Sequence, residues 1–138
     1  RKAFRENLPA PASPEEAVAH AATSKGYLTG LDGRRIPIRS AHSALNALLQ
    51  GAGAVIMKQA AVILDGLLDT AGLVHGVDYG YCANVHDEWQ IEVKDVNGNP
   101  ELVGQLCEQA FNLAGTSLNL RVAIDGEAKI GNNWSETH

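Results

Sequence analysis

The triplet His86-Asp87-Glu88 is the part of the sequence whose residue types could do chemistry most directly. Its β-prone neighbours, Val85 before it and Ile91 after it, place the triplet at or beside the tip of a hairpin. Two adjacent carboxylates in a regular strand point to opposite faces, whereas at a turn both can approach one cation. Mg²⁺ often takes only one or two protein carboxylates and completes its shell with substrate phosphate. Asp87 and Glu88 are therefore candidate metal ligands, although a solvated polar turn would have the same residue types.

A second acidic pair lies near the end of the chain. Apolar and polar residues alternate from Leu118 to Ile130, which predicts a half-buried strand with Asp125 and Glu127 on one face. These two carboxylates either face solvent or join the triplet at residues 86–88 in the site of a small metal-dependent hydrolase. The hydrolase interpretation requires that Asp125 and Glu127 approach Asp87 in the folded chain.

His42, Asn46 and Gln50 recur every four positions in the segment 40–57, which contains no Asp, Glu, Lys or Arg. Eighteen such residues are near the lower limit for a membrane span. Three polar side chains on one helix face make a poor span, so we expect no membrane partner. Two alternatives remain, namely a buried core helix with satisfied polar groups and a face that contacts DNA. Side-chain amides suit the DNA-contact alternative, because every base pair presents hydrogen-bond acceptors in the minor groove.

The elements that must position these groups are indicated by caps, turns and periodicity. Before residue 13, the opening sequence is typical of a helix end that runs into a proline-stopped loop. The expected elements are a helix from a Ser13 cap to about Ser24, a hairpin over Tyr27–Ile38, a helix from a Ser40 cap to about Thr70, a β segment over Tyr81–Lys94, a loop over Asp95–Pro100 and a helix over Glu101–Leu118.

Composition bounds the class of protein. A chain of 138 residues with 45% hydrophobic and 20% charged residues has enough material for one domain, which excludes a disordered tail. The net charge of −5 taken alone argues against a nucleic-acid binder. The charge is unevenly distributed, however, because residues 25–58 carry five basic groups and one acid, whereas residues 59–138 carry three basic groups and twelve acids. The net charge therefore does not exclude a nucleic-acid contact by residues 25–58, the basic stretch.

Cys82 and Cys107 show neither a disulfide framework nor a metal-binding spacing, which indicates free thiols in a reducing compartment. The chain opens at Arg1 without a signal segment, and in what looks like the middle of a helix. We therefore expect a piece of a longer protein of the cytoplasm.

Four sequence motifs follow one another in a fixed order. They are Gly30-Leu31-Asp32-Gly33-Arg34-Arg35, then Arg39-Ser40 leading into Asn46 and Gln50-Gly51, then Val85-His86-Asp87-Glu88, and finally Gly131-Asn132-Asn133-Trp134 before His138. In this order they resemble the C-terminal third of family A DNA polymerases, over roughly residues 26–138. The third motif is the specific one and resembles the third conserved palm motif of that family. The short connection between Arg35 and Ser40 is similar to that of the phage-type branch.

The resemblance implies an α+β fold, in which a small antiparallel sheet with a catalytic-type hairpin packs against long helices. Residues 1–25 would be the end of the fingers or a connecting helix, and residues 26–138 the C-terminal part of the palm. The implied function is that of a DNA-directed DNA polymerase, which adds deoxynucleotides to a primer 3′ end during replication by two-metal phosphoryl transfer. The implied partners are two Mg²⁺ ions, primer-template DNA, deoxynucleoside triphosphates and the remaining fingers, thumb and upstream palm.

The resemblance also implies roles for the acidic triplet. Asp87 would ligate the catalytic metals, Glu88 would be a supporting carboxylate, and His86 would lie near the primer terminus. Trp89 stands where the family usually has a smaller aliphatic residue, which affects packing more than catalysis.

For the basic stretch, the resemblance implies contacts with DNA. Asn46 and Gln50 would contact the minor groove around the terminal base pairs, and Arg34 and Arg35 would approach the backbone. His42 stands where many members have arginine, so a cationic contact there is in doubt.

The first palm motif, with its own metal-binding aspartate, and the nucleotide-binding helix of the fingers are absent from the sequence. Because one aspartate cannot build a two-metal site, we expect the isolated chain to be inactive. The alternative function is a non-catalytic module that binds DNA or protein and retains the palm fold.

Overall fold

The computed structural model describes residues 13–96 and 99–137. They belong to two compact units, which divide between Ala52 and Gly53 and are treated separately below. The predicted helix end before residue 13 and the terminal His138 lie outside the described residues. The predicted subdomain boundary at residue 25 stays a prediction.

The first unit begins with α2 (Pro14–Lys25), as its cap signals predict. The Ser13 side chain accepts a hydrogen bond from the Glu16 backbone N–H at 3.3 Å, and Pro14 occupies the first turn. Gly26 ends the helix in the left-handed region with φ 72°, a conformation that glycine adopts without strain. Both ends of this helix are therefore determined by local sequence.

The predicted first hairpin is confirmed. Strands β1 (Tyr27–Thr29) and β2 (Arg35–Pro37) pair antiparallel, with Leu28 opposite Ile36. The hairpin and α2 share a small core in this unit, whose buried members are Ala22, Leu28 and Ala44.

A 3₁₀ turn, η1 (Ala41–Ser43), precedes the long helix α3 (Ala44–Thr70). Ser40 is a cap, as predicted, but it caps η1, where its side chain accepts from the Ser43 backbone N–H at 3.4 Å. The expectation that His42 is a residue of the long helix is therefore wrong, because His42 lies in the tighter turn before it.

By length and composition alone, the segment Ala41–Thr70 is apolar enough to cross a membrane. In the C-terminal half of this segment, buried residues recur three or four positions apart, at Met57, Ala60, Leu64 and Leu68. This spacing forms one stripe of an α-helix, as in a helix that packs against a protein core.

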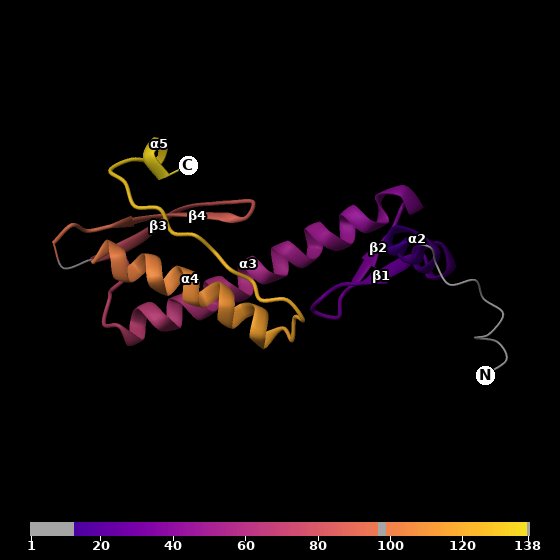
Figure 1. The fold of residues 1–138 in the computed structure, drawn as a ribbon, viewed down its shortest axis with the longest axis horizontal. Helices are drawn as coiled ribbons and strands as arrows, with labels where there is room; N and C mark the ends of the chain where they lie inside the picture. The colour runs from indigo at the N-terminus through magenta and orange to yellow at the C-terminus, as the bar shows by residue number, and fades with distance from the viewer. Residues whose placement is uncertain (1–12, 97–98, 138) are drawn as a thin grey trace. The chain divides into compact units, whose positions relative to one another are not determined.

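The second unit contains the C-terminal part of α3, a second hairpin and two further helices, shown in Figure 1. These elements are β3 (Tyr79–Val85), β4 (Glu88–Val93), α4 (Pro100–Ser117) and α5 (Trp134–Thr137). The hairpin and α4 confirm their predictions to within two residues, whereas α5 was not predicted. Together with the first unit they confirm the predicted α+β class.

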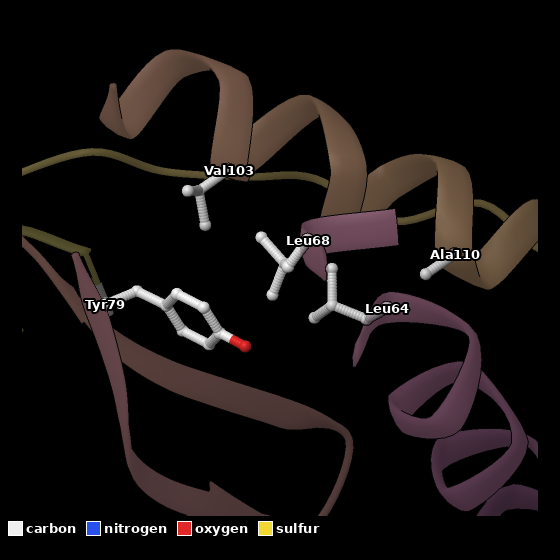
Figure 2. Close-up of a cluster of buried hydrophobic side chains, with 5 residues drawn as sticks. All are labelled: Leu64, Leu68, Tyr79, Val103 and Ala110. Carbon is white, nitrogen blue, oxygen red and sulfur yellow. The ribbon is translucent and has the colours of Figure 1, made fainter. Parts of the chain in front are cut away.

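Figure 2 shows the core of the second unit, in which Leu64 and Leu68 of α3 are fully buried. Tyr79 approaches them from β3, and Val103 and Ala110 approach from α4. Because these five side chains come from three elements, the core fixes the base of the second hairpin against both helices.

The predicted strand over Leu118–Ile130 is wrong. After its first residues, which close the turn at the end of α4, this segment runs back along α4 and pairs with no strand of the described chain. At one end of the contact, the Ala128 backbone N–H donates to Glu108 Oε1 at 3.0 Å. A Cβ at Gly104 would lie 3.0 Å from that of Ala128, so the segment fits closely because α4 has a glycine there.

The alternation in this segment nevertheless has a physical basis. Ile124 lies against Gly115, and Gly126 lies against the Phe111 ring, so that every second residue faces α4. A period of two requires only an extended backbone with one buried face, and here that face packs on a helix although the backbone pairs with no strand of the described residues.

Candidate catalytic hairpin and polar helix face

The tip of the second hairpin is a two-residue turn formed by His86 and Asp87. The strand register closes it by pairing Val85 with Glu88. His86 has φ 52°, in the left-handed region that two-residue hairpin turns use and that non-glycine residues rarely adopt. The prediction that the acidic triplet lies at a hairpin tip is confirmed.

Asp87 is exposed at this tip. Among residues 13–96 and 99–137, no hydrogen bond or ion pair engages its carboxylate. A carboxylate that is solvated and has no partner in the chain can take a cation without first losing another contact. Its oxygens are the ligand type that hard divalent cations select, so the chemistry of Asp87 fits part of such a site.

Glu88 has a different environment from its neighbour. It is half-buried, and its Oε1 accepts hydrogen bonds from the Gln90 side-chain amide and from the Trp134 indole N–H, the latter at 3.2 Å. The Thr137 hydroxyl in turn donates to Gln90 Oε1 at 3.3 Å. The start of β4 is therefore joined to α5 by a series of side-chain hydrogen bonds.

The turn that precedes α5 is built around Glu136. Its carboxylate accepts from the Asn132 backbone N–H at 2.8 Å and from the Asn133 side-chain amide at 2.7 Å. These two bonds lower the pKa of Glu136. A Cβ at Gly131 would lie only 2.6 Å from that of Glu136, so glycine is required there. The motif at residues 131–134 thus folds into a turn that presents Trp134 to β4.

Trp89 fixes the hairpin on its other side. Its ring stacks on Phe111 of α4, with ring centroids 4.7 Å apart and an interplanar angle of 20°. This offset arrangement adds to the energy of burial, so the bulky residue next to Glu88 has a packing role.

The hydrolase interpretation is wrong. Asp125 and Glu127 are exposed, and the Asp125 carboxylate accepts from the adjacent Gly126 backbone N–H at 3.0 Å. Within the described part of the chain, no three His, Cys, Asp or Glu side chains gather as a metal site. The pair Asp125 and Glu127 therefore does not join Asp87 and Glu88 in a metal site.

The polar helix face is exposed. Asn46 and Gln50 lie one turn apart on α3, and His42 lies in η1. The alternative in which these side chains are buried and satisfied in a core is therefore wrong, and the DNA-contact alternative stays a prediction.

The two arginines of the first hairpin are also exposed, but each has an intramolecular contact. Arg34 forms an ion pair with Asp32 in the turn. The Arg35 guanidinium lies 4.8 Å from the centroid of the Tyr27 ring, which is a cation–π arrangement. Both side chains can still reach solvent, although Asp32 offsets part of the positive charge of this turn.

The sequence did not reveal the partners of Glu88. Trp134 is part of a motif that resembles the polymerase family, but it lies 46 residues from Glu88, and no local pattern predicts their contact. Gln90 is two residues beyond Glu88 in the same strand, and this spacing places both on one face.

Comparison with known proteins identifies the family. The model of DNA polymerase family A matches residues 2–136. The DNA-directed DNA polymerases of Enterobacteria phage T3 and Escherichia phage T7 are each 34% identical over 154 aligned residues, covering all of this chain and 22% of those proteins. DNA polymerase I of Pseudomonas aeruginosa is 35% identical over 129 residues, covering 85% of this chain and 13% of that protein.

A solved structure with a similar fold is the POL domain of Pol1 from M. smegmatis, in complex with DNA primer-template and dNTP. It is 28% identical with a TM-score of 0.61, and the match covers 72% of this chain and 19% of that one. The chain thus spans about a fifth of the length of the phage relatives and of this structure. On the match over residues 2–136 and the similar fold, the chain belongs to DNA polymerase family A.

Proposed function

We propose that this chain is the C-terminal part of the palm of a DNA-directed DNA polymerase, which extends a primer by two-metal phosphoryl transfer. The exposed Asp87 carboxylate, without a partner in the described chain and held at a hairpin tip, carries the proposal. The phage and bacterial relatives support a polymerase that works in the bacterial cytoplasm.

In this proposal Asp87 and Glu88 hold divalent cations, with Mg²⁺ as the expected ion. When bound, such ions activate the primer 3′-hydroxyl and stabilise the charge on the triphosphate. The contribution of the chain is to place one solvated carboxylate in a two-residue turn and a second, hydrogen-bonded carboxylate beside it. His86 adds an imidazole at the same turn, where it would approach the primer terminus.

The polar face formed by His42, Asn46 and Gln50 is proposed to contact the minor groove of the primer-template. Amides donate and accept, and every base pair offers acceptors in that groove, so such contacts hold DNA with little regard to sequence. Arg34 and Arg35 are proposed to approach the phosphate backbone, where positive charge adds affinity.

The test uses the complete polymerase that contains this chain. Asp87→Asn should reduce the single-turnover rate of primer extension by roughly 10³-fold or more, because the lost charge serves the transition state. The Kd for primer-template should change by less than about threefold. Asp95→Asn, an exposed aspartate in the loop after β4, is the matched control and should keep the wild-type rate.

A rate of Asp87→Asn within about tenfold of wild type would contradict the proposed role of Asp87. The alternative, a non-catalytic binding module, predicts that the complete wild-type protein binds primer-template but extends no primer. The isolated chain is expected to be inactive under either function, so it does not distinguish them.

A further inference from the structure

Two hydrogen bonds that Glu88 accepts converge on one oxygen. Gln90 donates from the same strand and Trp134 donates from α5, both to Oε1. The last torsion of a glutamate side chain is broad and roughly two-fold, so a carboxylate without such donors samples many orientations. Two donors that approach from different elements reduce this freedom and fix the plane of the carboxylate.

Burial does not account for the Trp134 contact. Trp134 is 51% exposed, so its burial is only partial. The helix that carries it, α5, has only four residues and has no stability of its own. Its position depends on the bond from Thr137 to Gln90 and on the Glu136 turn.

We infer that Trp134 is a positioning residue, whose indole N–H orients the Glu88 carboxylate and so tunes a site that it does not itself touch. The inference rests on the proposed function for its effect on turnover. Groups that orient a metal-binding carboxylate typically change metal affinity or rate by about 10- to 100-fold when they are removed. Binding of primer-template should be unaffected, because the proposed role of Trp134 passes through the Glu88 carboxylate.

The kinetic test compares Trp134→Phe with wild type in the complete polymerase. Phenylalanine retains an aromatic ring and removes the N–H. We expect kcat to fall about 10- to 100-fold and the half-saturating Mg²⁺ concentration to rise, with the Kd for primer-template within about twofold. Ser135→Ala, at an exposed neighbour in α5, should behave as wild type.

A double mutant separates positioning from general structure. In a Glu88→Gln background, Trp134→Phe should add less than about a twofold loss, because its effect passes through the Glu88 carboxylate. An equal loss in both backgrounds, or a change confined to DNA binding, would overturn the inference.

A second readout does not depend on turnover. In the complete polymerase labelled with ¹⁵N-tryptophan, the Trp134 indole signal is the one that disappears in Trp134→Phe. Its N–H should exchange with solvent at least about fivefold faster in Glu88→Ala than in wild type. Unchanged exchange would overturn the inference. If wild type extends no primer, the proposed function fails, while this measurement still tests the contact between Trp134 and Glu88.

Discussion

The two hairpins of the chain each carry an aspartate in the turn, but the two side chains differ in their contacts. Asp32 accepts from the Arg34 backbone N–H at 3.3 Å and pairs with the Arg34 guanidinium. Within the described residues, Asp87 has no such contact. An aspartate that stabilises its own turn has its charge compensated internally, whereas the described residues leave the charge of Asp87 uncompensated, as the proposed ligand role requires.

Of the substitutions that distinguish the two hairpins, alanine in place of each turn aspartate should have the largest effect. In the complete polymerase, Asp87→Ala should reduce primer extension by roughly 10³-fold or more, and Asp32→Ala by less than about threefold. Single-turnover extension with saturating primer-template measures both. Comparable losses in the two variants would remove the functional distinction between the turns.

The units that carry the hairpins differ in the size of their cores. Leu64 is fully buried among side chains from three elements, while Leu28 is 7% exposed in a small cluster. Leu64→Ala should destabilise its unit by about 3–5 kcal/mol and Leu28→Ala by about 2–3 kcal/mol, because the smaller core collapses more easily. Urea unfolding, followed by probes in each unit, gives both values. A larger loss at Leu28 would contradict this ranking.

Gln50 tests whether the polar helix face contacts DNA. Gln50→Ala should weaken primer-template binding by about three- to tenfold, since one neutral hydrogen bond contributes roughly 0.5–1.5 kcal/mol. The loss should not depend on the terminal base pair. Gln105→Ala, at an exposed position of α4, is the control for fluorescence anisotropy measurements. A loss that varies strongly with the terminal base pair would contradict minor-groove contact.

The smallest expected effect is on the titration of Asp32. Partial desolvation of its side chain, which is 26% exposed, opposes ionisation, but the Arg34 backbone N–H, side chain and charge together lower the pKa of Asp32. The contact with Arg34 is therefore fully formed above the ordinary pKa of 3.8 and is lost as the pH falls through the lowered value. NMR titration should show Arg34→Ala returning the Asp32 pKa towards 3.8, and no change would contradict the pairing.

Local signals in the sequence predicted most of the elements. Ser13, Pro14 and Gly26 suffice to delimit α2, because caps act within one turn. The tip at His86 and Asp87 followed from β-prone neighbours. The strand predicted over Leu118–Ile130 failed because alternation reports an extended backbone with one buried face and not whether that backbone pairs with a strand.

The site was only partly predictable. Asp87 and Glu88 were identified from residue type and motif, but their different environments depend on contacts distant in sequence. Trp134 reaches Glu88 across 46 residues, and no periodicity encodes that meeting. Tertiary packing thus determines which carboxylate is oriented by partners and which one is exposed.

The position at which a divalent cation binds on this chain distinguishes Asp87 from Asp32 most directly. Mn²⁺ broadens the NMR signals of nuclei near it, so titration of the ¹⁵N-labelled chain locates even a weak site. We expect selective broadening at residues 85–88, loss of that broadening in Asp87→Ala, and little effect at residues 30–34. Equal broadening at both turns, or broadening at residues 85–88 that survives Asp87→Ala, would contradict this expectation.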